Sequence, residues 1–244
     1  MLKKNLLKLI LVKKVIRKTL INLNKRVVIN MNNYKLAVFD MDGTLLRRRT
    51  IFVFAEKKGF MDDLLKIVNS NKESYKKSIA IAKLLKGMNS SELLKIFRNI
   101  PLRENVEKVI NEIKKKGIKT AIITNSYQFV ADDLKSRLDI DWAFANNLII
   151  DKNIVTGELI LNNKKLVKQF DGCNIHSICK ECVLIDLCKK LNITTEEAIA
   201  IGDGLIDKCM IKKAGLGIAF HAPQVVQKYA DISTSDFSIL LNYI

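Results

Sequence analysis

Two short apolar runs in this chain each lead into a pair of closely spaced carboxylates. Residues 34–40 (YKLAVFD) open the segment Asp40-Met41-Asp42-Gly43-Thr44-Leu45, and residues 198–201 (AIAI) open Gly202-Asp203-Gly204-Leu205-Ile206-Asp207. Uninterrupted apolar runs of this length are typical of strands buried on both faces of a parallel sheet. Ligands of open α/β sheets bind at the carboxyl ends of such strands. Both acidic segments are therefore predicted to lie where a ligand binds.

In the rest of the chain, predicted strands alternate with predicted helices. Further apolar runs predict strands at residues 120–124 and 216–220 and a hairpin from residues 148–150 and 154–160. Helices are predicted at residues 103–116, 181–191, 207–213 and 236–243, the first of them stopped by Gly117. Residues 49–98 are rich in Lys and Leu and predict several helices. The alternation predicts an α/β fold with a parallel sheet and a helical insertion at about residues 45–100.

The charge of the chain is strongly basic and unevenly distributed. Lys and Arg number 42 against 25 Asp and Glu, a formal net charge of +17. Nine of the basic residues lie in residues 1–30, which contain no acid, and Leu2, Leu9, Val12, Ile16 and Leu20 share one arc of a helical wheel. Two interpretations of residues 1–30 remain open: an interfacial helix on anionic lipid, giving peripheral membrane contact, or an appended and disordered extension.

Composition excludes several classes of protein. The chain is 48% hydrophobic, which is ample for a core and excludes intrinsic disorder. No stretch approaches the ~20 apolar residues of a transmembrane helix, and residues 9–12 are too short for a signal-peptide core. Five cysteines do not make a disulfide scaffold. We therefore expect a cytoplasmic protein in a reducing compartment.

Two further segments lie between the acidic ones. Thr124-Asn125-Ser126 is predicted to end the second strand and to open a helix, where a hydroxyl and free N–H groups hold a phosphate oxygen. Lys180 begins the helix before the last acidic segment, where its ammonium neutralises phosphate charge. Gly43 permits a tight turn whose N–H groups face an anion. Carboxylates with remaining water are a typical Mg²⁺ ligand set.

This ordered set resembles the haloacid dehalogenase (HAD) superfamily, over residues 34–244. The closest likeness is to its phosphoserine phosphatase-like branch, and residues 141–147 with the hairpin, the Lys180–Asp203 spacing and residues 213–220 are similar to that branch. The resemblance implies a Rossmann-like core with a parallel sheet and an inserted helical cap. The expected domains are a basic extension (1–30) and a HAD-like hydrolase (31–244), with its core at 31–46 and 101–244 and its cap at about 47–100.

The resemblance also implies roles for single residues. Asp40 is the nucleophile that forms an aspartyl-phosphate, and Asp42 is the general acid and base. Mg²⁺ is bound by Asp40, Asp42 through its backbone carbonyl, and Asp203, with Asp207 close by. Gly43, Thr124, Asn125 and Lys180 bind the phosphoryl group.

Two departures from the branch pattern concern the substrate and the metal. Phosphoserine phosphatases carry a cap Glu where this chain has Arg49, within Arg47-Arg48-Arg49. An acid that recognises a substrate amine has become a base, so phosphoserine itself is not the expected substrate. The arginines either meet a second anionic group of the substrate or form a solvated cap hinge. Ile206 replaces an Asn that usually supports the metal.

The cysteines raise a separate question. Cys173, His176, Cys179 and Cys182 have the spacing of a second metal site, but Lys180 lies between two of them. A second metal, a regulatory thiol and inert structural cysteines all fit the pattern.

The leading hypothesis is a Mg²⁺-dependent phosphatase of a small phosphomonoester. The alternatives are a catalytically weak module that binds a phosphorylated ligand or a protein partner, and a phosphatase for a membrane-associated phosphate. Nucleic acid is not an expected partner, because the basic segment has no interleaved aromatic residues. The oligomeric state is not indicated by the sequence.

Overall fold

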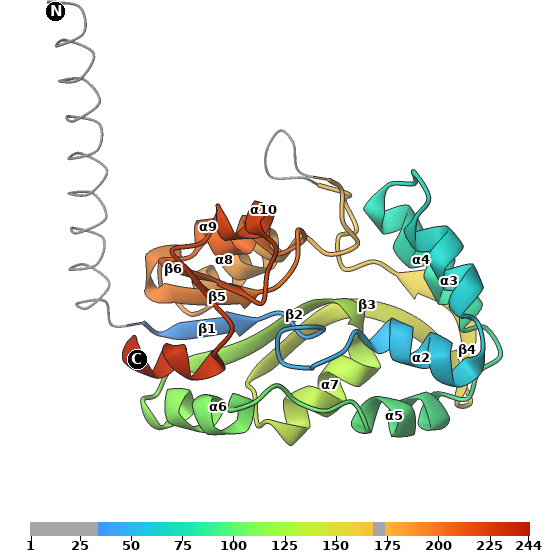
Figure 1. Cartoon of the computed structure of the whole chain (residues 1–244), viewed down its shortest axis with the longest axis horizontal. Helices are drawn as coiled ribbons and strands as arrows, with labels where there is room; N and C mark the ends of the chain where they lie inside the picture. Colours follow the sequence, from blue (N-terminus) through green and yellow to red (C-terminus); the bar gives the residue numbers. More distant parts are fainter. Residues whose placement is uncertain (1–33, 168–173) are drawn as a thin grey trace, which may run out of the picture. The chain divides into compact units, whose positions relative to one another are not determined.

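The computed structural model describes residues 34–167 and 174–244, and the interpretations of residues 1–30 fall outside this part of the chain. Its centre is a seven-stranded sheet of order β4-β3-β2-β1-β5-β6-β7, parallel except for β4 (Figure 1). The strands are β1 (Leu36–Phe39), β2 (Lys119–Tyr127), β3 (Trp142–Asp151), β4 (Ile154–Ile160), β5 (Ala198–Gly202), β6 (Leu216–Phe220) and β7 (Ile232–Thr234). The predicted α/β fold with a mostly parallel sheet is confirmed.

The central strand β1 is buried on both faces, as its apolar run predicts. Leu36 and Val38 belong to a core cluster with apolar residues of α8 (Lys180–Lys190), and the ring of Phe39 lies 5.9 Å from that of Phe237 in η2 (Phe237–Asn242). Successive side chains of a strand point to opposite faces, so one apolar run serves both layers. Figure 1 shows α8 and α9 (Lys208–Lys213) on one side of the sheet and α6 (Val106–Lys115) and α7 (Gln128–Arg137) on the other.

The sequence of α6 explains both its packing and its end. Val106, Val109, Ile110 and Ile113 recur at helical spacing and are all buried. The chain then turns at Gly117, whose φ of 74° suits a glycine after a helix. The helix predicted at residues 103–116 is thus present, although it begins three residues later.

Four helices occupy the stretch between β1 and α6: α2 (Thr50–Lys58), α3 (Met61–Val68), α4 (Ser74–Leu84) and α5 (Ser90–Arg98). Helix α4 packs on β4, and α5 lies beside α7, where Arg98 pairs with Asp133 at 2.6 Å (Figure 1). The helices predicted for residues 49–98 are therefore confirmed, whereas the domain boundaries remain a prediction. Among the described helices, none is both long and apolar enough to cross a membrane.

Two local expectations differ from the structure, and three short elements were not predicted. Strand β2 continues through Thr124, Asn125 and Ser126 to Tyr127, with an irregular register against β3, so α7 opens only at Gln128. The helix predicted at 236–243 is the short 3₁₀ helix η2. The remaining elements, η1 (Thr195–Glu197), α10 (Gln224–Gln227) and β7, were not predicted, because each is too short to show a periodic pattern.

Candidate active site

The two acidic segments meet at the carboxyl edge of the sheet. They follow β1 and β5, which are adjacent strands in register, Phe39 beside Ile201. Asp40, Asp203 and Asp207 can each place one carboxylate oxygen within 4.8 Å of the others. Adjacent parallel strands that end together bring these side chains to one point, as the sequence pattern predicts.

Gly43 makes this meeting possible. Its φ of 99° is a left-handed conformation, and a Cβ at this position would lie 2.4 Å from Oδ2 of Asp203. Gly202, at the start of the second acidic segment, has a similar role, since a Cβ there would lie 2.4 Å from Cβ of Asp207. Both glycines are therefore required by close packing of the acidic segments.

Lys180 is the cation inside this cluster. Its side chain is fully buried, and its Nζ donates to Oδ1 of Asp40 and Oδ1 of Asp207, each at 2.5 Å. Burial lowers the pKa of Lys180, but the charges and hydrogen bonds of Asp207 and Asp40 outweigh it and hold the pKa above its ordinary value. The ammonium therefore stays charged beside the two carboxylates.

Asp207 organises the second acidic segment. It is fully buried, and its Oδ2 accepts hydrogen bonds from the backbone N–H groups of Asp203, at 3.1 Å, and Gly204, at 2.8 Å. Both of its carboxylate oxygens thus have partners within the chain. Asp207 aligns Asp203 and Lys180 as well as belonging to the acidic cluster.

The acidic groups carry more negative charge than the protein itself balances. Burial raises the pKa of Asp40, and the charges of Asp207 and Asp203 raise it further, against the lowering effect of Lys180. Burial and the charge of Asp207 raise the pKa of Asp203 to about 6. Buried carboxylates that repel one another fit a divalent cation with oxygen ligands. The donor set therefore fits Mg²⁺.

Asp42 is held by the first residue of α2. Its Oδ1 accepts from both the backbone N–H, at 3.0 Å, and the hydroxyl, at 2.5 Å, of Thr50. Burial raises the pKa of Asp42, while the Thr50 hydrogen bonds lower it. Thr50 was missed by the sequence analysis; it is the first residue of α2, where backbone N–H groups have no partner within the helix and can bind a carboxylate.

Of the three consecutive arginines, only Arg49 faces the site. Its Nη2 lies 3.8 Å from Oδ2 of Asp203. Arg48 instead pairs with Glu56 at 2.5 Å, and Arg47 donates to the carbonyl of Leu102 at 3.1 Å. Of the three, Arg49 alone is placed to meet an anionic group in the cavity, and its role in substrate selection stays a prediction.

The predicted phosphate ligands of β2 lie in different environments. Thr124 is fully buried, and its hydroxyl accepts from the backbone N–H of Ser126 at 3.2 Å. Because β2 continues to Tyr127, this hydroxyl is hydrogen-bonded within its own strand. Asn125 lines the cavity above Asp40. Its carbonyl accepts from Nδ2 of Asn146 at 2.8 Å, a positioning contact that the sequence analysis did not identify.

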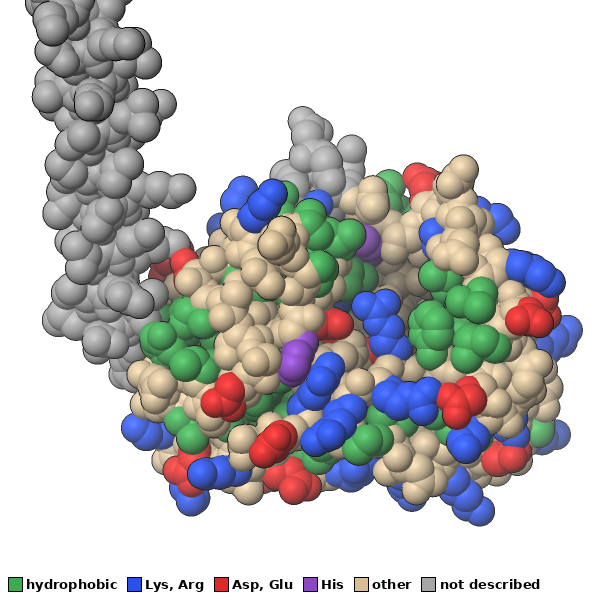
Figure 2. Space-filling model, in the orientation of Figure 1, with side chains coloured by type: hydrophobic (Ala, Val, Ile, Leu, Met, Phe, Trp, Pro, Cys, Tyr) green, Lys and Arg blue, Asp and Glu red, His purple; other side chains and the backbone are tan. Residues whose placement is uncertain are grey.

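The site opens into a cavity of about 630 Å³ between the strand ends and the helices α2 to α4. Figure 2 shows a hollow with Lys and Arg side chains around it and the two histidines of the chain nearby. Its lining includes Asp40, Asp42, Asp203, Arg49, Lys72, Lys77, His176 and His221. The three carboxylates lie on the floor, and the charged lining residues from the helices are basic.

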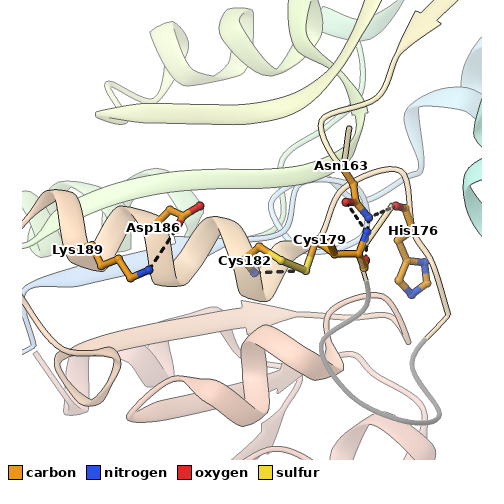
Figure 3. Close-up of a disulfide and its surroundings, with 7 residues drawn as sticks. Asn163, His176, Cys179, Cys182, Asp186 and Lys189 are labelled. Carbon is orange, nitrogen blue, oxygen red and sulfur yellow. Dashed lines mark hydrogen bonds and ion pairs between the residues drawn. A yellow bond between two sulfur atoms is a disulfide. The ribbon is translucent and has the colours of Figure 1, made fainter. Parts of the chain in front are cut away.

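A second metal site, one of the three interpretations of the cysteines, is not assembled in the described residues. Cys179 and Cys182 are joined in a disulfide, Nδ1 of His176 lies 2.8 Å from Oγ of Ser74, and Cys173 falls outside the described part (Figure 3). Within residues 34–167 and 174–244, the acidic cluster is the group suited to a metal. A four-residue site in the reduced chain stays a prediction.

Comparison with models of protein families shows which family the chain belongs to. The family model for haloacid dehalogenase-like hydrolases matches residues 34–215, which is most of the sequence and includes both acidic segments, Thr124 and Lys180. The chain belongs to the haloacid dehalogenase-like hydrolases.

Relatives of this hydrolase place it in the phosphoserine phosphatase-like branch. It is 32% identical to a phosphoserine phosphatase of Archaeoglobus fulgidus, covering 82% of this chain and 56% of the relative. It is 31% identical to one of Methanocaldococcus jannaschii, covering 86% of this chain and 97% of the relative. The hydrolase thus spans about half of the first relative and nearly all of the second.

Solved structures agree with these relatives. A phospho-aspartyl intermediate analogue of phosphoserine phosphatase superposes on the hydrolase with a TM-score of 0.74 at 29% identity, over 87% of this chain and 99% of the other. A substrate-bound phosphoserine phosphatase gives a TM-score of 0.74 at 28% identity, over 86% and 98% of the two chains. The predictions of the superfamily, the branch and a phosphatase-type enzyme are confirmed.

Proposed function

We propose that this protein is a Mg²⁺-dependent phosphatase that hydrolyses a small phosphomonoester through an aspartyl-phosphate on Asp40. The observation that carries the proposal is the contact of Lys180 with both Asp40 and Asp207, beside Asp203, at the floor of the cavity. Phosphoryl transfer needs positioning and charge neutralisation more than covalent assistance. The residues on the floor of the cavity supply both the positioning and the charge neutralisation.

The metal would be held by Asp40, the backbone carbonyl of Asp42, and Asp203, with Asp207 behind them. When bound, Mg²⁺ supplies positive charge that lets an anionic nucleophile approach an anionic phosphate. Lys180 neutralises further phosphoryl charge and holds Oδ1 of Asp40, which leaves Oδ2 for attack. Asn125 at the cavity wall supplies hydrogen bonds to the phosphoryl oxygens.

The chain's own acids carry the proton transfers. Oδ2 of Asp40 bonds to phosphorus while the bond to the substrate oxygen breaks, and Asp42 gives that oxygen a proton. Asp42 then takes a proton from the water that attacks phosphorus, which returns Asp40 as a carboxylate and releases inorganic phosphate. A raised pKa suits Asp42 to the first of these tasks, because a larger fraction is protonated at a given pH.

The first test is hydrolysis of a panel of phosphomonoesters with and without Mg²⁺. We expect Mg²⁺-dependent turnover that falls by about 10³-fold or more in Asp40→Asn, since this change removes the nucleophile. Asp186→Asn, at an exposed position of α8, is the matched control and should keep full activity. Tight binding of a phosphomonoester without turnover would support the alternative of a catalytically weak binding module.

The substrate is proposed to carry a second anionic group, and phosphoserine is not expected to be the preferred one. Arg49, Lys72 and Lys77 line the cavity from the side of α2 to α4. Among the described lining residues, the only carboxylates are those on the floor, so the ammonium of phosphoserine would meet no acid on the opposite wall. By its resemblance to the phosphoserine phosphatase-like branch, the chain has Arg49 where that branch carries a Glu that recognises this amine.

Phosphomonoesters that differ in one charged group test the effects of the ammonium and of the carboxylate separately. Phosphoserine and 3-phosphoglycerate differ only by an ammonium against a hydroxyl, and phosphoethanolamine lacks the carboxylate. We expect kcat/KM for 3-phosphoglycerate to exceed that for phosphoserine by about tenfold, and Arg49→Glu to reverse the order. The same change at Arg48, which pairs with Glu56, is the control. A preference for phosphoserine in the wild-type chain would overturn this part of the proposal.

A further inference from the structure

Cys179 and Cys182 span the first turn of α8. Their sulfurs form a disulfide with the Cα atoms 5.3 Å apart, and Cys179 is the residue that precedes the helix (Figure 3). Sγ of Cys179 also accepts from the backbone N–H of Cys182 at 3.4 Å. The disulfide therefore links the same two residues, at the ends of this turn, that the hydrogen bond to the Cys179 sulfur already joins.

The residue enclosed by this turn is Lys180. It is the first residue of α8, and its buried Nζ contacts Asp40 and Asp207 at 2.5 Å each. The backbone that carries the cation of the active site is thus cross-linked on both sides. Any change in this turn moves the ammonium relative to Asp40.

The segment that enters the turn is fastened to α4. The backbone N–H of Tyr75 donates to the carbonyl of Ile175 at 3.2 Å, and Oγ of Ser78 donates to Oγ of Ser177 at 3.2 Å. His176, whose Nδ1 lies 2.8 Å from Oγ of Ser74, lines the cavity. The disulfide lies where a segment docked on the helical insertion meets the helix that carries Lys180.

The other described cysteines are poor targets for oxidation. Cys188 is buried, and burial followed by the charge of Glu197 raises its pKa to about 11. Cys209 is buried as well and is not part of a disulfide. Cys179 and Cys182 are only half-buried, and the start of a helix favours the thiolate that reacts with disulfides. Among the cysteines that the structure describes, oxidation is therefore selective for this pair.

We propose that Cys179 and Cys182 are a reversible dithiol–disulfide pair whose oxidised form positions Lys180 for catalysis. The oxidant is a small-molecule disulfide of the glutathione class. The thiolate of one cysteine attacks it, forming a mixed disulfide and releasing one small thiol, and the other cysteine displaces the second small thiol. The two cysteines lose two electrons and two protons, which the two released thiols carry away.

The effect on catalysis rests on the function proposed above. The oxidised form holds Lys180 against Asp40, as observed, whereas the reduced turn keeps only non-covalent ties: the hydrogen bond from Cys182 to Sγ of Cys179 and that from the N–H of Val183 to the Cys179 carbonyl, at 3.1 Å. Small displacements of a positioning group cost large factors in rate. We expect kcat of the reduced enzyme to be about three- to tenfold below that of the oxidised enzyme, with a smaller change in KM.

The test uses the full chain equilibrated with defined ratios of oxidised and reduced glutathione. Intact mass and alkylation mapping report the disulfide, and steady-state kinetics with Mg²⁺ report kcat and KM. The fraction of disulfide and kcat should follow the same midpoint potential. Amide hydrogen exchange at residues 180–184 should be slower in the oxidised form, a readout that needs no substrate.

Variants separate the pair from other thiols. Cys179→Ser keeps a side-chain acceptor before α8, so the helix start is preserved, and Cys182→Ser removes the partner. Both should have the kcat of the reduced wild-type enzyme at every glutathione ratio, while Cys188→Ala should respond as the wild type does.

Three results would overturn the proposal: no disulfide at any ratio, equal kcat in both states, or a response that persists in Cys182→Ser. Absence of turnover in every sample would count against the proposed function alone. The mass and hydrogen-exchange results would still decide whether the pair oxidises and tightens α8.

Discussion

At the scale of the residue, Gly43 decides whether the two acidic segments can meet. Gly43→Ala would place a Cβ 2.4 Å from Asp203 Oδ2 and force a left-handed conformation on alanine. We expect a loss of about 1–3 kcal/mol in the free energy of unfolding and a fall of at least about tenfold in kcat/KM. Urea unfolding and steady-state kinetics measure the two effects.

Gly117 supplies the matched control for this change. Its φ of 74° is also left-handed, but nothing lies within 4 Å of a Cβ there. Gly117→Ala should therefore cost about 1 kcal/mol of stability and leave kcat/KM unchanged. Equal losses of activity in the two variants would show that the contact with Asp203 is irrelevant.

Single residues also show how far the sequence predicts the site. The sequence predicted that Asp40, Asp203 and Lys180 lie at one site, because each adjoins a strand or helix with a clear apolar pattern. The different directions of Arg48 and Arg49 were not predictable, since each follows from a local partner, Glu56 or Asp203. Side-chain partners distant in sequence leave no periodic signal.

At the scale of the element, the extension of β2 beyond Thr124 depends on one buried amide. Nδ2 of Asn146 donates to the carbonyls of Asn125, at 2.8 Å, and Ser126, at 3.3 Å, and its Oδ1 accepts from the N–H of Asn162 at 3.1 Å. The two carbonyls of this irregular strand end therefore find a donor in the Asn146 side chain instead of in a regular ladder. The sequence predicted the strand, but this tertiary contact sets its end.

Asn146→Ala tests this arrangement. It leaves several buried polar groups without partners, so we expect a loss of about 2–4 kcal/mol in the free energy of unfolding and a lower kcat as Asn125 shifts. Asn147→Ala, at the exposed neighbouring position of β3, should change stability by less than about 0.5 kcal/mol. Denaturant unfolding of both variants compares them, and equal losses would contradict the role given to Asn146.

At the scale of the whole molecule, the proposed metal site would couple metal binding to stability. Mg²⁺ bound there would relieve the repulsion among Asp40, Asp203 and Asp207, so it should bind the folded chain in preference to the unfolded one. We expect a saturable rise in Tm, equivalent to about 2–3 kcal/mol at a hundredfold excess over Kd. Calorimetry should show a smaller rise in Asp203→Asn and an unchanged rise in Asp186→Asn. A rise of equal size in Asp203→Asn would place the metal elsewhere.

His176 makes stability depend on pH in the opposite direction to the carboxylates whose pKa values are raised. Burial, followed by the charge of Lys180, lowers the pKa of His176 to about 4, against an ordinary value of 6.5. Between these values the unfolded chain binds a proton that the folded chain does not, so this contribution is complete above pH 6.5 and is lost as the pH falls.

The measurement compares the wild type with His176→Asn in urea at pH 7 and pH 4.5. The wild type should lose about 2 kcal/mol more than the variant over this range. Losses of equal size would show that His176 is not protonated differently in the folded and unfolded chains.

In the proposed mechanism, Asp40 becomes phosphorylated during turnover. The most direct measurement is a rapid acid quench of the Mg²⁺ enzyme with a ³²P-labelled phosphomonoester, followed by peptide mapping. We expect label on the peptide that contains Asp40, and none in Asp40→Asn. Label on another residue, or steady turnover by Asp40→Asn, would contradict it.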